Sequence, residues 1–192
     1  MTEPNNDAAV YEVMDAHAAA IGHIAIAWNN LHHTFGEIFI DLVAPKNPRM
    51  GWAIWRSAES DAAARDMLFA VSRATRKRKI AFALQELRWV LKTVPSADRN
   101  AAIHTPYGLQ ITDTEIIVLP LVRGTKTLTR KNLQTRLAAY ERRIRAAYNF
   151  TLSVQKTMES GGRSPLSQRP RLLYKSNGRA RRSNKRTYSS AA

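Results

Sequence analysis

Apolar residues and one histidine recur in the N-terminal part of the chain at alternating steps of four and three residues. The series runs Val10, Met14, His17, Ile21, Ile24, Trp28, Leu31, Phe35, Ile38 and Leu42. This spacing places its members on one face of a helix that is buried against other helices. Pro45 and Pro48 follow, and proline ends helices. The pattern therefore predicts one long helix over residues 8–43.

Shorter helical segments are predicted in the next part of the chain. A helical turn is expected over residues 51–56, and either Ser57 or Ser60 can cap the helix that follows. That helix is expected to break at the basic run of residues 76–79. A further apolar stripe at helical spacing consists of Ile80, Leu84, Leu87 and Leu91. Pro95 is expected to stop this helix.

The periodicity changes after residue 108. Leu109–Thr112 and Glu115–Leu119 are short runs rich in β-branched residues, and Asp113–Thr114 separates them. Two such runs around a short turn predict a small β-hairpin over about residues 109–119.

A second long series at four-and-three spacing follows the hairpin. Its members are Leu133, Leu137, Tyr140, Ile144, Ala147, Thr151, Val154 and Met158. Thr127 or Thr129 can open this helix and Gly161–Gly162 can end it. The chain is therefore predicted to be mainly α, an up-and-down helical bundle with a small hairpin insertion.

The last 32 residues differ in composition from the rest. They contain nine basic residues, many serines and two prolines, and Leu172–Tyr174 is their one apolar spot. Such a composition favours disorder with local docking at most. We therefore divide the chain into a helical domain, residues 1–160, and a flexible basic tail, residues 161–192.

The formal net charge of +15 is unevenly distributed. The balance is +1 over residues 1–110, +6 over 111–158 and +8 over 159–192. Such asymmetry predicts a polyanionic partner, most simply nucleic acid. A membrane partner is not expected, since the tail has few bulky apolar anchors and no apolar run approaches the roughly 20 residues of a span. The absence of cysteine and of a signal-peptide pattern fits the cytoplasm.

Basic clusters are the candidates for contact with a nucleic-acid backbone, because Lys and Arg neutralise phosphates. They are Arg76, Lys77, Arg78, Lys79, Arg142, Arg143, Arg145, Arg179, Arg181 and Arg182.

The strongest chemical signal is Arg99-Asn100 followed by His104. A guanidinium presents a fork of donors that fits a phosphate, and an imidazole moves protons near neutral pH. Ser96 is expected to cap a short helix that carries all three residues and to leave free N–H groups for a phosphate. Arg99 precedes His104 by five residues, so its side chain must bend back to reach the histidine.

This Arg-Asn-x3-His pattern resembles the signature of the HEPN superfamily. The resemblance implies an α-helical bundle and a metal-independent endoribonuclease that needs no cofactor. It also implies a toxin–antitoxin, abortive-infection or antiviral defence context, with an antitoxin or another defence protein as a partner.

The resemblance further implies roles for the three motif residues. His104 would act as general base or acid, Arg99 would stabilise charge on the phosphoryl oxygens, and Asn100 would orient His104 or the phosphate. The RNA 2′-hydroxyl would attack phosphorus and leave a 2′,3′-cyclic phosphate. A homodimer would bring a second copy of the motif to the same cleft.

Four other residues are candidates for lining the site: Tyr107, Asn30, His33 and Glu37. Tyr107 follows His104 by three residues, and packing at the helix end is the more ordinary role for it. The other three share the long first helix, where an exposed polar face with an i,i+4 pair is the simpler interpretation. His33 and Glu37 offer two metal ligands, but no further ligand has convincing spacing, so no metal site is expected.

Two other functions remain open at this point. The chain could be a non-catalytic helical module that binds nucleic acid through its basic residues. It could also be an interaction subunit of a defence complex that uses its apolar helix faces as interfaces.

Overall fold

The fold is a mainly helical bundle with one small β-hairpin, as predicted. The computed structural model describes residues 6–112, 114–121 and 128–174. The elements in chain order are α1 (Asn6–Val43), α2 (Pro48–Arg56), α3 (Asp61–Ala74), η1 (Arg78–Ile80), α4 (Ala81–Thr93), α5 (Ser96–His104), β1 (Tyr107–Ile111), β2 (Ile116–Pro120), η2 (Arg130–Asn132), α6 (Leu133–Glu159) and η3 (Arg171–Leu173).

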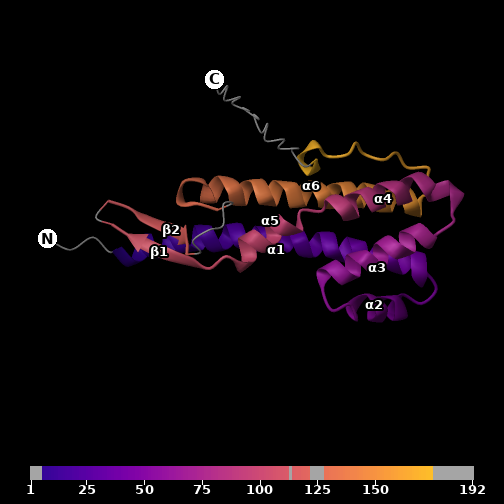
Figure 1. The fold of residues 1–192 in the computed structure, drawn as a ribbon, viewed down its shortest axis with the longest axis horizontal. Coiled ribbons are helices and arrows are strands. Elements are labelled where there is room, and N and C mark those ends of the chain that lie inside the picture. The colour runs from indigo at the N-terminus through magenta and orange to yellow at the C-terminus, as the bar shows by residue number, and fades with distance from the viewer. Residues whose placement is uncertain (1–5, 113, 122–127, 175–192) are drawn as a thin grey trace, which may run out of the picture.

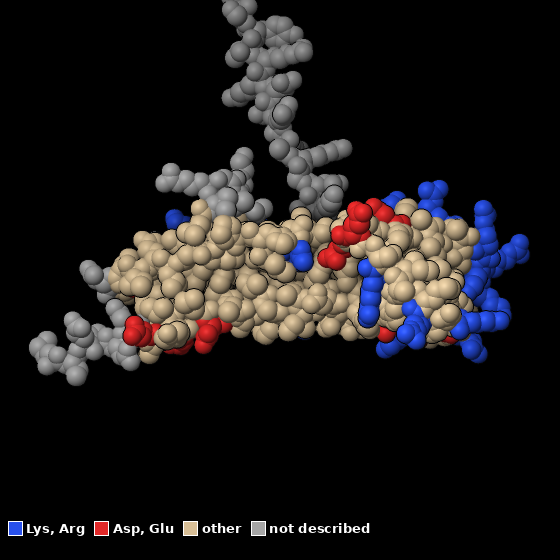
Figure 2. All heavy atoms as spheres, turned by 90° about the horizontal axis from the view of Figure 1, so that it is seen from below, with Lys and Arg blue, Asp and Glu red and all other residues tan. Residues whose placement is uncertain are grey.

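The two long helices, α1 and α6, lie side by side along the molecule and set its elongated shape (Figure 1). The hairpin lies at one end, and α2 and α3 lie toward the other. Lys and Arg side chains gather at the end opposite the hairpin (Figure 2). The charged side chains of the described residues are therefore unevenly distributed in space on this face of the molecule.

Both predicted apolar series form buried helix faces. In α1, Ile24, Leu31, Phe35 and Ile38 have no exposed surface, and in α6 the same holds for Ile144 and Val154. The first turns of α1 are an exception, since Met14 is 47% exposed. There α1 extends past the start of α6, so its apolar face has less to pack against (Figure 1).

The buried side chains form two clusters along this axis. The larger one joins α1, α3, α4 and α6 around residues such as Phe35, Leu87 and Phe150. The smaller one joins α1 and α6 to α5 through Trp28, Ala102 and Ile144. Ala102 is fully buried, so the motif helix is anchored to the bundle by its inner face. Burial of apolar surface of this kind is the main stabilising force in folding.

Two of the predicted caps are present. The Ser60 hydroxyl accepts a hydrogen bond from the backbone N–H of Ala63 at 3.2 Å and caps α3. Thr129 forms a reciprocal capping box with Asn132 at the entry to η2 and α6. Thr127, the alternative helix start, lies outside the described residues. Each cap satisfies backbone donors that a helix start leaves unpaired.

The hairpin starts two residues earlier than the sequence pattern indicates. Strands β1 and β2 are antiparallel, with Tyr107 opposite Pro120 and Ile111 opposite Ile116. The sequence pattern places the first strand at Leu109 because Pro106 and Gly108 indicate the end of the preceding helix. In the structure, the strand begins directly after Pro106, which ends the motif helix.

Helix α6 ends at the predicted glycine pair. Gly161 and Gly162 have φ values of 64° and 87°, and the Gly162 N–H donates to the carbonyl of Thr157. A Cβ at Gly162 would collide with the carbonyl oxygen of Lys79. Glycine is needed at position 162 because the backbone is left-handed there and because it approaches the carbonyl of Lys79 closely.

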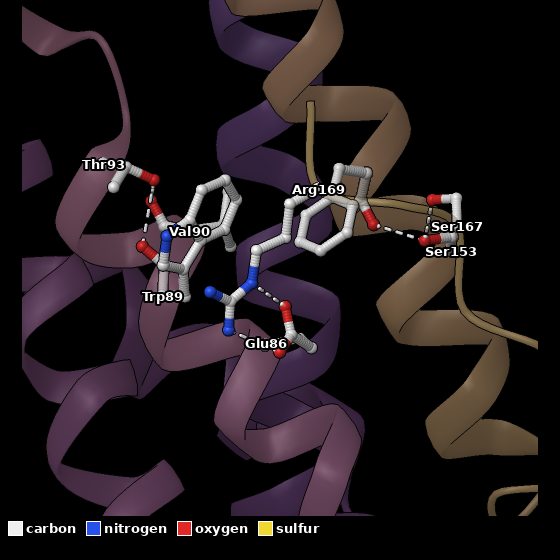
Figure 3. A network of polar contacts seen from close by, with 8 residues as sticks. Glu86, Trp89, Val90, Thr93, Ser153, Ser167 and Arg169 are labelled. Atoms are coloured by element: carbon white, nitrogen blue, oxygen red, sulfur yellow. Dashed lines mark hydrogen bonds and ion pairs between the residues drawn. The ribbon is translucent and has the colours of Figure 1, made fainter. Parts of the chain in front are cut away.

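Residues 163–174 do not trail from the bundle but lie along it as an extended strap (Figure 1). Leu173 is 1% exposed, and the Ser167 and Ser153 hydroxyls are 2.6 Å apart. Arg169 forms two hydrogen bonds with the Glu86 carboxylate of α4, at 2.6 and 2.7 Å (Figure 3). The packed part of the chain thus extends to Tyr174, beyond the boundary predicted at residue 160, because a few specific contacts outweigh the polar composition. Residues 175–192 lie outside the described residues.

We expect Arg169→Ala to lower the free energy of unfolding by about 2 kcal/mol. Glu86 is 6% exposed, and removing the Arg169 guanidinium leaves this buried carboxylate without its counter-charge. The partial exposure of Arg169 keeps the loss below the full cost of a broken buried pair. Urea unfolding measures it, with exposed Arg171→Ala as the matched control. Equal stability of both variants would show that the strap contact is not stabilising.

Candidate active site

Helix α5 begins differently from the prediction. Pro95 occupies the N-cap position, Ser96 is the first helical residue, and no side chain caps this end. The prediction that Ser96 is the N-cap of this helix is therefore wrong. The N–H groups of Asp98 and Arg99 both donate to the Pro95 carbonyl, at 3.1 and 3.3 Å, and the Ser96 N–H donates to the carbonyl of Val94 at 2.9 Å. These donors are not free for a phosphate, so the helix start contributes less to anion binding than the sequence indicated.

The three motif residues meet at the surface of α5. One terminal nitrogen of Arg99, Nη1, lies 3.0 Å from Nε2 of His104 and donates to Oδ1 of Asn100 at 3.0 Å. The Arg99 side chain thus bends back along the helix and spans the five-residue separation. Asn100 and His104 are exposed and Arg99 is half-buried. The arrangement places a cation, an amide and an imidazole at one solvent-accessible point.

The tautomer of His104 follows from this contact. A guanidinium can only donate, so Nε2 of a neutral His104 accepts and the ring proton lies on Nδ1. A guanidinium bound to a phosphate would turn away and leave Nε2 free as a base. Binding of a phosphate would thus replace the hydrogen bond from Arg99 to His104 with hydrogen bonds from Arg99 to the phosphate.

Trp28 of α1 supports Arg99 from beneath. The guanidinium carbon lies 5.9 Å from the centre of the indole ring, and Nε of Arg99 is buried without a hydrogen-bond partner among the described residues. The indole N–H donates to the Asp61 carboxylate at 2.8 Å, which fixes the plane of the ring. A cation over an indole face is attracted by the ring quadrupole. Helix α1 thus holds the catalytic candidate in place.

A second arginine lies against the same indole. The guanidinium carbon of Arg65, on α3, is 5.6 Å from the Trp28 ring centre. Its Nη1 lies 3.2 Å from Nε2 of His32, and Nδ1 of His32 faces the Asp61 carboxylate at 3.7 Å. Since Arg65 must donate, His32 is held as the neutral Nδ1–H tautomer.

Burial lowers the pKa of His32 from 6.5 to about 4; Asp61 opposes the shift, while Arg65 and Arg99 add to it. The effect of Arg99 shows that His32 lies within electrostatic reach of the motif. A neutral histidine beside the Arg65 guanidinium and the Trp28 ring supports the site without adding positive charge.

The shift of His32 predicts a pH dependence of stability. The unfolded chain binds a proton at His32 below about pH 6.5, whereas the folded chain does so only near pH 4. The free energy of unfolding is therefore undiminished by His32 above pH 6.5, and it falls by roughly 2–3 kcal/mol as the pH falls toward 4. We expect the difference in unfolding free energy between wild type and His32→Asn, measured in urea, to shrink by this amount between pH 7 and pH 4.5. A difference that is constant with pH would contradict the assignment.

Asp98 connects the motif helix to α6 and to the strap. Its carboxylate lies 2.6 Å from Nη1 of Arg143, whose Nε donates to the carbonyl of Leu172 at 3.1 Å. Burial raises the pKa of Asp98, and Arg143 and Arg136 oppose that shift. The ion pair fixes the first turn of α5, next to Arg99. Arg143, a predicted phosphate contact, therefore serves a structural role here.

Tyr107 does not join the motif. Its hydroxyl donates to the carbonyl of Ala102 at 3.0 Å, and its ring packs edge-on against His17 with the centroids 4.3 Å apart. Both ring nitrogens of His17 are buried without a partner among the described residues. Burial lowers the pKa of His17 and raises that of Tyr107. Tyr107 thus packs at the helix end, which was the simpler expectation.

The polar candidates on α1 face elsewhere. His33 stacks on Trp52 of α2 at 5.0 Å and lies 3.4 Å from the Glu37 carboxylate. Glu37 also accepts a hydrogen bond from Gln155 of α6. The backbone carbonyl of Asn30 accepts a hydrogen bond from the Thr34 hydroxyl at 3.1 Å. The exposed-face interpretation therefore fits these residues better than a role in the Arg99 site.

The basic candidates fall into three groups. The run Arg76–Lys79 is exposed where α3 joins α4, at the basic end of the molecule (Figure 2). On α6, Arg142 is exposed, while Arg145 pairs with Glu141 of its own helix at 2.7 Å. Arg179, Arg181 and Arg182 lie outside the described residues.

Sequence patterns did not identify the support beneath Arg99. Trp28 is one more member of the apolar series of α1, and the i,i+4 spacing of Asp61 and Arg65 fits an exposed ion pair as well as a support for the site. His32 was overlooked in favour of its neighbour His33. Only the crossing of α1, α3 and α5 brings these residues together. The one available signal was the polar cluster at the start of α3, four residues apart as a helix requires.

Within the described residues, no helix is long and apolar enough to cross a bilayer. The same part of the chain contains no group of three or more His, Asp or Glu side chains arranged to hold a metal ion.

No family model matches the chain, and neither a curated protein nor a solved structure is significantly similar to it. The chemistry of the site therefore follows from its own residues.

Proposed function

We propose that the protein is a metal-independent endoribonuclease with Arg99, Asn100 and His104 at its catalytic centre. One observation carries the proposal: a single nitrogen of Arg99 lies 3.0 Å from both the His104 imidazole and the Asn100 amide oxygen, on an exposed helix face. A phosphate-binding cation in contact with a proton-transfer group is what phosphodiester cleavage needs.

In the proposed reaction, the 2′-hydroxyl oxygen of RNA forms a bond to the adjacent phosphorus as the bond from phosphorus to the 5′ oxygen breaks. His104 accepts the 2′ proton through Nε2, and Arg99 stabilises the negative charge that builds on the phosphoryl oxygens. Asn100 holds the guanidinium in position. The products are a 2′,3′-cyclic phosphate and a 5′-hydroxyl.

The leaving 5′ oxygen needs a proton, and one chain offers one motif histidine for two proton transfers. We propose that a twofold homodimer places His104 of a second copy opposite the first, since twofold symmetry repeats a surface residue across the axis. The resemblance to HEPN nucleases supports this arrangement. It also supports a cytoplasmic toxin or antiviral defence role with a regulating partner protein.

The test of the proposal is cleavage of labelled single-stranded RNA and of DNA with the same sequence, both in EDTA. We expect cleavage of RNA alone, because DNA lacks the 2′-hydroxyl that attacks phosphorus. Equal cleavage of DNA would contradict the mechanism. Restoration of activity by Mg²⁺ after no cleavage in EDTA would contradict metal independence.

A non-catalytic nucleic-acid-binding module is the second candidate. The exposed run Arg76–Lys79, at the end where basic side chains gather, favours it (Figure 2). Such a module would bind RNA with strong salt dependence and leave it intact, with and without Mg²⁺. His104→Ala would then change neither affinity nor the RNA.

A further inference from the structure

Two neighbouring hollows on the surface lie between α3 and α4. One, of about 250 Å³, is lined by Ala62, Arg65, Asp66, Phe69, Leu91 and Lys92. The other, of about 390 Å³, is lined by Phe69, Arg73, Arg88 and Lys92. Because Phe69 and Lys92 line both, the two hollows adjoin each other, and together we call them the α3–α4 groove.

The α3–α4 groove is strongly basic. Among the described residues that line it, four are cations and one, Asp66, is a carboxylate. Arg73 and Lys92 are exposed, and in the described part of the chain neither has an acidic partner within 4 Å. Arg65 has Asp61 and Asp66 nearby as counter-charges. Arg73 and Lys92 line the same hollow without such partners and repel each other, so their gathering there favours the binding of an anion.

The floor of the groove is apolar and fixed. Phe69 is half-buried, and Nζ of Lys92 lies 5.0 Å from the centre of its ring. Arg88 donates to the carbonyl of Ser72 at 2.9 Å, which ties α4 to α3. An aromatic ring flanked by cations is the combination that binds single-stranded nucleic acid, where phosphates meet the charges and a base lies on the ring.

Arg65 connects this groove to the candidate active site. It lines the smaller hollow, and its guanidinium lies against the Trp28 indole that also supports Arg99. Arg99 and Arg65 therefore share the Trp28 ring, and from Arg65 the cationic side chains follow one another along the groove to Arg73. Three residues beyond Arg73, the exposed run Arg76–Lys79 begins.

We propose that the α3–α4 groove binds the phosphates of a single-stranded RNA whose scissile bond lies at Arg99 and His104. The inference rests on the proposed function for the position of the cut, whereas binding in the groove is testable by itself. It assigns Arg65, Arg73, Arg88 and Lys92 to substrate binding, none of which is among the nucleic-acid candidates of the sequence analysis.

The experiment measures the affinity of a labelled 12-nucleotide single-stranded RNA over a range of salt concentrations. All proteins carry His104→Ala so that the RNA stays intact. The test variant adds Arg73→Gln and Lys92→Gln, and the matched control adds Lys131→Gln and Arg171→Gln, two exposed cations outside the groove. Thermal unfolding checks that both remain folded.

We expect the groove variant to bind roughly 20-fold more weakly at 0.1 M salt, with a plot of log affinity against log salt that is shallower by about 1.4. The control should match its parent. Equal losses in both variants, or no loss in the groove variant, would overturn the inference. If the groove variant loses affinity while wild type leaves RNA uncut, the groove assignment stands and the nuclease proposal fails.

Discussion

Replacing His104 with alanine is expected to lower the rate of RNA cleavage by about 100-fold or more, with little change in RNA affinity. The imidazole is the proton-transfer group in reach of the Arg99 guanidinium, and general acid–base catalysis contributes about 10²- to 10⁴-fold. Affinity should persist because Arg99 and the basic surface are retained. Single-turnover cleavage and equilibrium binding, measured on the same RNA, separate the two effects.

The matched control is His23→Ala. His23 is an exposed histidine of α1, so its loss tests whether any surface imidazole matters. It should leave cleavage unchanged. If both variants cleave at the wild-type rate, His104 is not catalytic and the proposed mechanism is wrong.

Arg99→Lys should lower cleavage by about 100-fold, although it conserves the charge. Lysine is a compact point charge, whereas the planar guanidinium, which Asn100 helps to hold, can present several donors to the phosphoryl oxygens at once. Loss of one preorganised donor to developing charge typically costs 10²- to 10³-fold. The rate constant for cleavage at saturating protein measures the effect.

Arg136→Lys provides the control for this substitution, since Arg136 is an exposed arginine on α6. Its cleavage rate should stay within a factor of two of the wild type. Wild-type cleavage by Arg99→Lys would show that positive charge alone suffices and would remove the planar guanidinium from the mechanism.

Much of the fold was predictable from local patterns. The four-and-three series of α1 and α6 places apolar side chains on one face, and those faces are buried in the structure. The hairpin and the glycine end of α6 follow from strand propensity and from the left-handed backbone that glycine favours. These features depend on neighbours in sequence, so the sequence contains the information.

The strap and the support beneath Arg99 depend instead on distant residues. Arg169 pairs with Glu86 across 83 positions, and a single buried ion pair leaves no periodic signal. Trp28, Asp61 and Arg65 converge only through the packing of α1 against α3. The motif itself was visible because its three members lie within six residues, yet its contact required Arg99 to bend back along the helix.

The most direct test of the proposed endoribonuclease is the chemistry of its products. An RNA that carries one 2′-deoxy nucleotide at a mapped cleavage position is incubated with the protein in EDTA, beside the all-ribose RNA, and the new ends are identified by mass. We predict a 2′,3′-cyclic phosphate and a 5′-hydroxyl from the all-ribose RNA, and no cut at the 2′-deoxy position. A cut at that position, or a 5′-phosphate end, would contradict attack by the 2′-hydroxyl and with it the mechanism built on Arg99 and His104.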